Sequence, residues 1–182
     1  MTGGPPDADH LTTGERETEQ LGAAIGRTLR GGDVLALEGP LGAGKTRLVR
    51  GIAAGLGLDP AEVSSPTYVL VQEYGPSPAG LTVAHADAYR LDDSASLESI
   101  GWDELVGEPD VVTIVEWASR IADALPATTV WIDLAFGAGD ADAPDGPGER
   151  RLIRLREAGG PAADAARRLR DALARQRDEP GR

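Results

Sequence analysis

The segment Gly39–Thr46 reads GPLGAGKT and matches the phosphate-binding pattern G-x-x-x-x-G-K-[ST] at every fixed position. Glycines permit a tight turn whose backbone N–H groups point at phosphate oxygens, and a helix that starts here directs the positive end of its dipole at the same anion. Lys45 supplies a compact cation for the β- and γ-phosphates, and the Thr46 hydroxyl is a ligand for Mg²⁺. The motif therefore predicts binding of a nucleoside triphosphate with Mg²⁺. The loop residues expected to contact it are Leu41, Gly42, Ala43, Gly44, Lys45 and Thr46.

The use of lysine supports this interpretation. Lys45 is the only lysine in the chain, and all the others of its 18 cationic residues are arginines. Arginine is a planar and bulky fork, whereas a tight phosphate loop needs a point charge. The only lysine of the chain therefore stands at the position in the phosphate loop where a compact cation is needed.

Two acidic residues follow apolar runs and are candidates for binding Mg²⁺ or for orienting a water molecule. Glu116 follows VVTIV, and Asp87 follows LTVAHA. An acid at the carboxyl end of a buried strand faces the ligand crevice of an open sheet, where it can hold Mg²⁺ or orient water. The plainer alternative is that each acid ends its strand in solvent. Trp117 follows Glu116 directly, and the sequence leaves open whether its ring packs in the core or stacks on a base.

Two further polar segments lie between these features. Residues 65–68 read SPTY, at the place where nucleotide switches carry a hydroxyl that senses the γ-phosphate; a proline-containing turn is the plainer interpretation. In the run HADAYRL, a strand would put His85, Asp87 and Tyr89 on one face. The charges at 149–151 are typical of ordinary surface.

Hydrophobic periodicity indicates the elements that must position these residues. Apolar residues recur about every four positions over 15–30 and 45–57, which predicts helices on either side of the apolar strand 34–37. The other expected strands are 68–74, 81–86, 111–115, 129–136 and 151–156, and the other expected helical segments are 94–106, 117–125 and a marginal helix after Pro161.

Early alternation of strands and helices, followed by clustered strands, predicts an α/β fold: a P-loop NTPase-like mixed sheet flanked by helices, in a single domain. The expected organisation has three parts. They are a flexible leader over 1–14, a P-loop domain over 15–157 that includes an acidic Gly/Pro loop at 137–148, and an Ala/Arg-rich tail over 158–182.

Composition excludes several classes of function. The chain has 182 residues, no cysteine, two histidines and a formal net charge of -12. Disulfides, zinc–cysteine sites, iron–sulfur clusters and multi-histidine metal sites are therefore excluded. Because phosphate-backbone binding depends on Lys and Arg, the excess of acid argues against a broad nucleic-acid surface. No apolar run approaches the roughly 18 residues of a membrane span, and the N-terminus lacks a secretory signature, so we expect a cytoplasmic protein without a membrane segment.

In this order, the motifs GPLGAGKT, SPTYVLV, HADAYRL and VEW resemble the TsaE (YjeE) family, the small ATPases of bacterial tRNA threonylcarbamoyladenosine synthesis. The resemblance implies a Mg²⁺-dependent ATPase that works with TsaD and TsaB. That pair transfers threonylcarbamoyl to an adenosine beside the anticodon, so the ATPase meets tRNA only through the complex.

The resemblance also assigns roles to residues. Lys45 and Thr46 correspond to the residues that hold phosphate and Mg²⁺. Asp87 and Glu116 correspond to the functional acids, with Glu116 near the metal or its water. Thr67 corresponds to the switch threonine. The implied catalytic set is thus Glu116, Asp87 and Thr67, and the implied metal ligands are Thr46 and Glu116.

More distant parts of the chain complete the implied nucleotide site. Trp117 corresponds to a tryptophan beside the nucleotide, and the segment from Glu15 to Thr18 corresponds to an N-terminal stretch on the nucleotide side. Arg150 or Arg151 corresponds to a late nucleotide-contacting arginine, and we assign Arg151 to this role. One departure is Pro40, where the family often has an acid; proline removes one backbone donor from the loop.

Two other functions compete with this one. A small-molecule kinase uses the same loop but needs a lid with arginines over the phosphates, and no lid-length insertion is present. A nucleotide-gated binding module would hydrolyse little, and the two acids argue against it. The guanine-reading motif N-K-x-D is excluded because the only lysine is Lys45.

Overall fold

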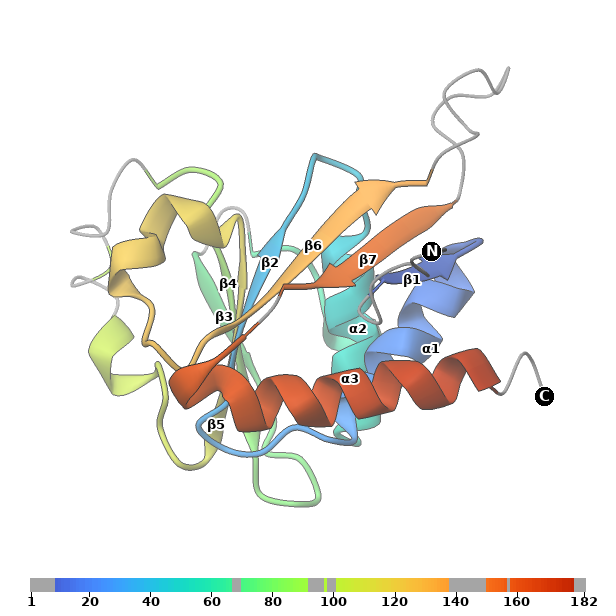
Figure 1. Ribbon diagram of the computed structural model, residues 1–182. Helices are drawn as coiled ribbons and strands as arrows, with labels where there is room; N and C mark the ends of the chain where they lie inside the picture. Colours follow the sequence, from blue (N-terminus) through green and yellow to red (C-terminus); the bar gives the residue numbers. More distant parts are fainter. Residues whose placement is uncertain are drawn as a thin grey trace.

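A twisted, seven-stranded mixed sheet forms the centre of the computed structural model (Figure 1). The structure describes residues 9–66, 70–91, 97, 101–137, 150–156 and 158–178. Thr67 and Tyr68 lie outside these residues, as do residues 94–96 and 98–100 of the helix expected over 94–106 and nearly all of the loop expected over 137–148. Within 101–106, the structure has only the 3₁₀ segment Trp102–Glu104 in place of that helix.

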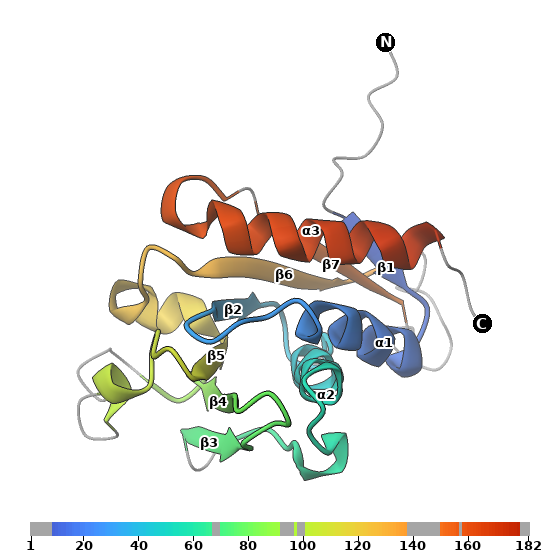
Figure 2. The same ribbon diagram turned by 90° about the horizontal axis from the view of Figure 1, so that it is seen from below.

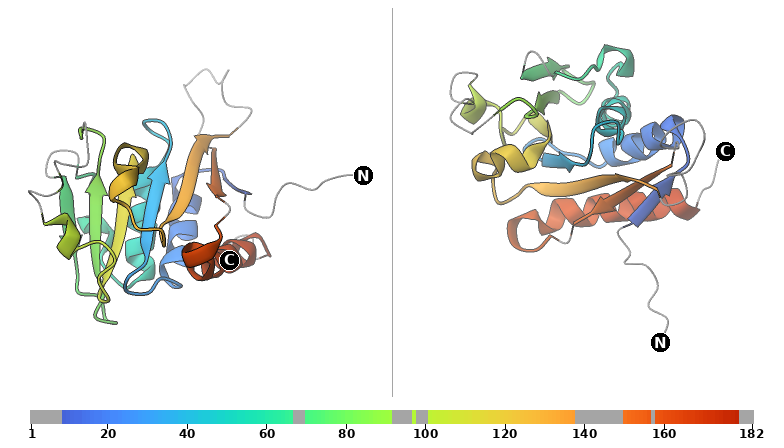
Figure 3. Two further views of the ribbon diagram at one scale, coloured as in Figure 1. Left: turned by 60° about the vertical axis from the view of Figure 1, so that its left-hand side comes forward. Right: turned by 90° about the horizontal axis from the view of Figure 1, so that it is seen from above.

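The strand order is β1-β7-β6-β2-β5-β4-β3, and the left view of Figure 3 shows the strands side by side from the green β3 to the orange β7. Strands β6, β2, β5 and β4 are parallel, whereas β3, β7 and β1 pair antiparallel. The predicted α/β class with a mixed sheet is therefore confirmed. The strands are β1 (Asp9–Thr12), β2 (Val34–Glu38), β3 (Val71–Tyr74), β4 (Thr82–Asp87), β5 (Val111–Glu116), β6 (Val130–Phe136) and β7 (Arg151–Leu155).

Helices α1 and α2 lie side by side against the sheet, and α3 runs along β6 and β7 (Figure 2). The helices expected over 15–30 and 45–57 are confirmed but end earlier. Within the described ranges, no helix combines the length and the apolarity that a bilayer crossing requires. The helices are α1 (Glu15–Gly26), α2 (Lys45–Gly55) and α3 (Ala163–Asp178), and the 3₁₀ segments are η1 (Pro60–Glu62), η3 (Trp102–Glu104), η4 (Ala118–Ala124) and η5 (Gly160–Ala162).

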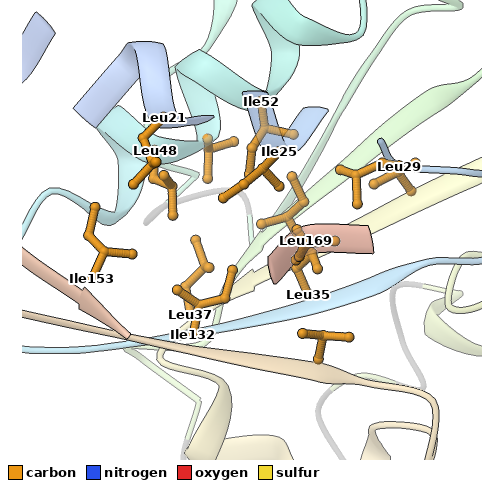
Figure 4. Close-up of a cluster of buried hydrophobic side chains, with 14 of the residues drawn as sticks. Leu21, Ile25, Leu29, Leu35, Leu37, Leu48, Ile52, Ile132, Ile153 and Leu169 are labelled. Atoms are coloured by element: carbon orange, nitrogen blue, oxygen red, sulfur yellow. The ribbon is translucent and has the colours of Figure 1, made fainter. Parts of the chain in front are cut away.

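Two apolar clusters bury the two faces of the sheet. Because side chains alternate along a strand, Leu35 and Leu37 of β2 enter the cluster under the α-helices, while Ala36 enters the one under η3 and η4. Figure 4 shows the first cluster, in which the side chains of α1, α2, α3 and the sheet meet. Its labelled members are Leu21, Ile25, Leu29, Leu35, Leu37, Leu48, Ile52, Ile132, Ile153 and Leu169.

The leader expected over 1–14 is wrong for Asp9–Thr12, which form the edge strand β1 and pair with β7. Asp9 accepts two hydrogen bonds from the Arg154 guanidinium, at 2.6 and 2.7 Å. At the other end of the strand, the buried Thr12 hydroxyl lies 2.9 Å from that of Thr18. A strand of four mostly polar residues shows no apolar periodicity. It could therefore not be predicted from its own sequence, and only its pairing with β7 identifies it.

The C-terminal segment joins the core through α3. The Arg168 guanidinium donates to both carboxylate oxygens of Asp33, at 2.8 and 3.0 Å, and also to the Thr28 carbonyl oxygen. Leu169 and Leu173 are buried in the first apolar cluster. The helix expected after Pro161 is therefore present as α3 and packs against the rest of the fold.

Helices α1 and α2 approach until their backbones touch, because glycine stands where they cross. A Cβ atom at Gly51 would lie 2.1 Å from the carbonyl oxygen of Glu19, and one at Gly22 would lie 2.4 Å from that of Leu48. No side chain fits in such a gap. The contact thus brings the start of α1 beside the start of α2. The glycines involved are Gly22, Gly26, Gly51 and Gly55.

We expect Gly51→Ala to lower the free energy of unfolding by about 1–3 kcal/mol, the usual cost of forcing an extra carbon into a packed site. The roughly 1 kcal/mol gain in helix propensity from glycine to alanine is too small to reverse this. Urea denaturation measures the change.

Gly159→Ala is the matched control, because Gly159 has φ of -117° and a Cβ atom added there would meet no atom within 4 Å. It should unfold at the same urea concentration as the parent protein or higher. Equal stabilities of the Gly51→Ala and Gly159→Ala variants would contradict the backbone contact.

Candidate functional site

The phosphate-loop motif connects β2 to α2 in the conformation that its sequence predicts. Gly42 and Gly44 have φ of 78° and 98°, in the left-handed region that favours glycine. Gly44 is the N-cap of α2, no side chain caps the helix, and its first turn contains no acid. Ordinary helices have a side-chain acceptor at this place. The start of α2 therefore leaves its N–H groups and the positive end of its dipole for an anion.

Lys45 is buried, with 4% of its surface exposed, and its ammonium group is held inside the loop. Nζ donates to the carbonyl oxygens of Gly39 and Pro40, at 2.7 and 3.0 Å. It also lies 3.9 Å from the centroid of the Trp117 ring, in cation–π geometry. Burial lowers the pKa of Lys45, and the nearby carboxylate of Glu116 opposes that shift most strongly. The cation is thus held ready where a phosphate would need it.

The sheet brings the two predicted acids together beside this loop. Parallel pairing sets Leu37 of β2 opposite Glu116 of β5, and Glu116 opposite Asp87 of β4. The chain leaves β2 through α2 and leaves β5 through η4, and these two segments pack on opposite faces of the sheet. Such a divergence at the carboxyl ends of parallel strands opens the crevice in which α/β proteins bind their ligands.

Glu116 is joined directly to the loop. Its Oε1 accepts a hydrogen bond from Thr46 Oγ1 at 2.7 Å, and the same oxygen lies 2.9 Å from His85 Nε2. A hydroxyl and a carboxylate are the oxygen donors that Mg²⁺ prefers. Among the described residues, no three His, Cys, Asp or Glu side chains gather around one point. Mg²⁺ commonly takes one or two protein oxygens and completes its set with phosphate and water, so the pair fits this metal.

Asp87 has a different set of partners. Its Oδ2 accepts from the Ser65 hydroxyl at 2.9 Å, and its Oδ1 accepts from the Tyr89 backbone N–H at 2.9 Å. The Ser65 contact ties the 65–68 segment to the end of β4. Thr67, the predicted switch residue in that segment, lies outside the described residues.

Trp117 lies between the loop and a second aromatic ring. It has φ of 58°, rare for so large a side chain, and its backbone N–H donates to the Leu37 carbonyl oxygen at 3.0 Å. Its ring lies 5.0 Å from that of Tyr89 between centroids, while the Lys45 ammonium lies over it. Strand β4 ends at Asp87, so the strand that would have put Tyr89 on one face with His85 and Asp87 does not extend to Tyr89.

Residues from β7 and α1 approach the loop from the other side. A Cβ atom at Gly44 would lie 4.0 Å from Arg151 Nε and 3.8 Å from Thr18 Cγ2. Arg151 stacks over the Phe136 ring, with Cζ 4.9 Å from the centroid. Of the two candidate arginines, the structure thus brings Arg151 beside the loop.

Glu15 lies at the start of α1 and pairs with Arg47 of α2 at 2.8 Å. Thr18 belongs to the 15–18 stretch that the resemblance assigned to the nucleotide side, and it lies beside Gly44 of the loop. Another neighbour of the loop, Phe136, was not identified from the sequence. Phe136 is the only phenylalanine, at the end of a strand, and this was the one available signal for it.

Comparison with known proteins gives a consistent result. Residues 12–141 match the family model described as threonylcarbamoyl adenosine biosynthesis protein TsaE. The range contains the loop, both acids and Trp117, whereas Arg151 lies beyond it.

Among curated relatives, the chain is 40% identical over 119 residues to the tRNA threonylcarbamoyladenosine biosynthesis protein TsaE of Treponema pallidum, covering 65% of this chain and 84% of that protein. It is 39% identical over 115 residues to TsaE of Bacillus subtilis, covering 63% and 69%. The crystal structure of Bacillus subtilis YdiB superposes with a TM-score of 0.69 at 27% identity, covering 94% of this chain and 95% of that one.

The Lys45–Trp117 contact predicts a fluorescence signal. A bound phosphate draws the ammonium away from the ring, so ADP should change the tryptophan emission of the protein. Trp117→Phe should abolish that change while leaving the fold intact.

Trp131→Phe is the matched control, because Trp131 also carries a cation over its ring, with Arg156 Cζ 4.7 Å from the centroid, but lies near the start of β6. The Trp131→Phe variant should keep the response to ADP. A response that disappears in the Trp131→Phe variant and persists in the Trp117→Phe variant would show that the reporting ring had been misassigned.

Proposed function

The chain belongs to the TsaE family, and on that basis we propose that it binds and hydrolyses ATP in the formation of threonylcarbamoyladenosine on tRNA. The contact between Thr46 and Glu116 carries the proposal. It joins the hydroxyl of the phosphate loop to the acid of the neighbouring strand at 2.7 Å, which is the combination that nucleotide hydrolysis with Mg²⁺ requires.

In this proposal the loop and its surroundings bind the nucleotide. Backbone N–H groups of the loop and of the first turn of α2 receive the phosphates, and Lys45 exchanges its two carbonyl partners for phosphate oxygens. Trp117 and Arg151 border the site, and Glu15 belongs to it through its pair with Arg47. The loop residues assigned to the nucleotide are Leu41, Gly42, Ala43, Gly44, Lys45 and Thr46.

Thr46 and Glu116 would hold Mg²⁺. Bound there, the metal neutralises charge on the phosphate oxygens. Glu116 and Asp87 are the proposed catalytic acids, with Glu116 nearest the loop hydroxyl and Asp87 holding the Ser65 segment. Thr67 is the proposed γ-phosphate sensor of that segment.

The proposed partners are TsaD and TsaB. A chain of net charge -12 has little means of holding tRNA over a broad surface, so tRNA is reached through these partners. We propose that ATP closes residues 65–68 on the γ-phosphate and shapes a surface for the pair, and that hydrolysis weakens that surface. Hydrolysis is then slow in isolation, and a role on tRNA implies the cytoplasm.

The test is ATP hydrolysis by the purified chain, with and without Mg²⁺ and with and without the TsaB–TsaD pair from the same organism. We expect weak activity that requires Mg²⁺ and rises when the pair is added. Nucleotide binding without any response to the pair would overturn the assigned partners, and transfer of phosphate to a small molecule in their absence would favour the kinase alternative.

We further expect Lys45→Ala to weaken ATP binding about 100-fold or more, because it removes a buried, charge-assisted contact worth about 3 kcal/mol. Isothermal titration calorimetry measures the affinity. Arg27→Ala removes one positive charge at the far end of α1 and should bind ATP as the parent does. Unchanged affinity in the Lys45→Ala variant would mean that the loop is not the main site.

A further inference from the structure

His85 is buried in the sheet, with none of its surface exposed, and lies on β4 beside Glu116 of β5. Its Nε2 lies 2.9 Å from Glu116 Oε1. Its Nδ1 is buried and has no hydrogen-bond partner among the described residues. A polar ring with one of its two nitrogens unsatisfied costs more to bury than an apolar side chain of the same size. Packing alone therefore does not account for histidine here.

The direction of the single hydrogen bond follows from its acceptor. An ionised carboxylate only accepts, so Nε2 carries a proton and donates to Glu116. Tyr74 of β3 neighbours the His85 ring, with 6.2 Å between the ring centroids, and the Tyr74 hydroxyl lies 2.9 Å from Gln72 Oε1.

Two donors thus converge on one oxygen of Glu116. Thr46 Oγ1 reaches Oε1 from the loop, and His85 Nε2 reaches it from β4. Within the described part of the chain, the other oxygen, Oε2, accepts no hydrogen bond. The arrangement anchors one carboxylate oxygen and leaves the other for a ligand.

We propose that His85 is a positioning residue for Glu116. This role rests on the proposed function, because Glu116 is the acid that is proposed to act beside the nucleotide. Thr46 stands in the loop and responds to whatever binds there, whereas His85 stands on a central strand and does not. His85 therefore holds the carboxylate in place throughout the cycle, and without it the orientation of Glu116 depends on the Thr46 hydroxyl alone.

The first test measures nucleotide affinity with Mg²⁺ and with EDTA in three variants. His85→Leu removes the donor, and His85→Gln keeps a side-chain N–H donor. Val83→Ala weakens packing at a fully buried position of the same strand without touching the site. Loss of a residue that orients a metal-binding carboxylate typically costs 10–100-fold. We expect the Mg²⁺-dependent gain in ATP affinity to fall about tenfold in the His85→Leu variant, with affinity in EDTA unchanged.

The controls separate positioning from simple stability. His85→Gln should recover most of the gain, and Val83→Ala should lower the melting temperature while keeping the gain. With the partner pair and Mg²⁺ present, His85→Leu should raise the KM for ATP in step with the lost affinity and should also lower kcat. A His85→Leu variant that folds and keeps the full Mg²⁺-dependent gain would overturn the proposal, as would equal losses in the Val83→Ala variant.

The second test needs neither metal nor nucleotide. The chain has two histidines, so ¹⁵N-histidine labelling gives two imidazole signals, and a His85→Gln sample assigns them. We expect His85 to carry a proton on Nε2, and Glu116→Gln to shift the Nε2 signal. An unprotonated Nε2, or no response to Glu116→Gln, would overturn the proposal. If the parent protein binds no ATP, the proposed function fails, and this spectrum still decides whether His85 holds Glu116.

Discussion

The parallel pairing of β5 with β2 on one side and with β4 on the other sets the position of Glu116. Leu37, Glu116 and Asp87 lie in one row across the three strands, and the loop begins at Gly39, shortly after Leu37. Side chains alternate along a strand, so a slip of one residue would turn Glu116 to the opposite face of the sheet. The contacts with Thr46 and His85 would then be lost together. The buried hydrophobic side chains of these strands, such as Leu35, Leu37 and Ile114, hold the register because each fits only one of the two faces.

Much of this site could be predicted from local sequence. The loop, Lys45, Thr46 and the two acids are identified by residue type and by the apolar runs that precede them, since the chemistry of phosphate and Mg²⁺ permits few alternatives. Central strands are also recognisable, because burial on both faces demands continuous apolar residues. These features depend on neighbours in the chain.

The features that escaped prediction depend on residues far apart in the chain. Strand β1 is short and polar, and it is held by an ion pair between Asp9 and Arg154, which are 145 residues apart in the sequence. The choice between Arg150 and Arg151 depends on which side chain turns toward Gly44. His85 belonged to a recognisable polar cluster, but its partner Glu116 lies on another strand. The glycines of α1 and α2 gave a visible spacing in each helix, yet only the crossing of the helices shows why that spacing exists.

That crossing has a mechanical consequence. Helices separated by side chains can slide as those side chains change rotamer, whereas α1 and α2 meet backbone to backbone and have no such layer between them. The two helices therefore behave as one rigid unit, which fixes the start of α1 relative to the start of α2. At the same end, Arg47 of α2 also forms ion pairs with Glu15 and Glu19 of α1. The first turn of α2, which holds Lys45 and Thr46, therefore keeps its place relative to the start of α1 when neighbouring side chains change rotamer.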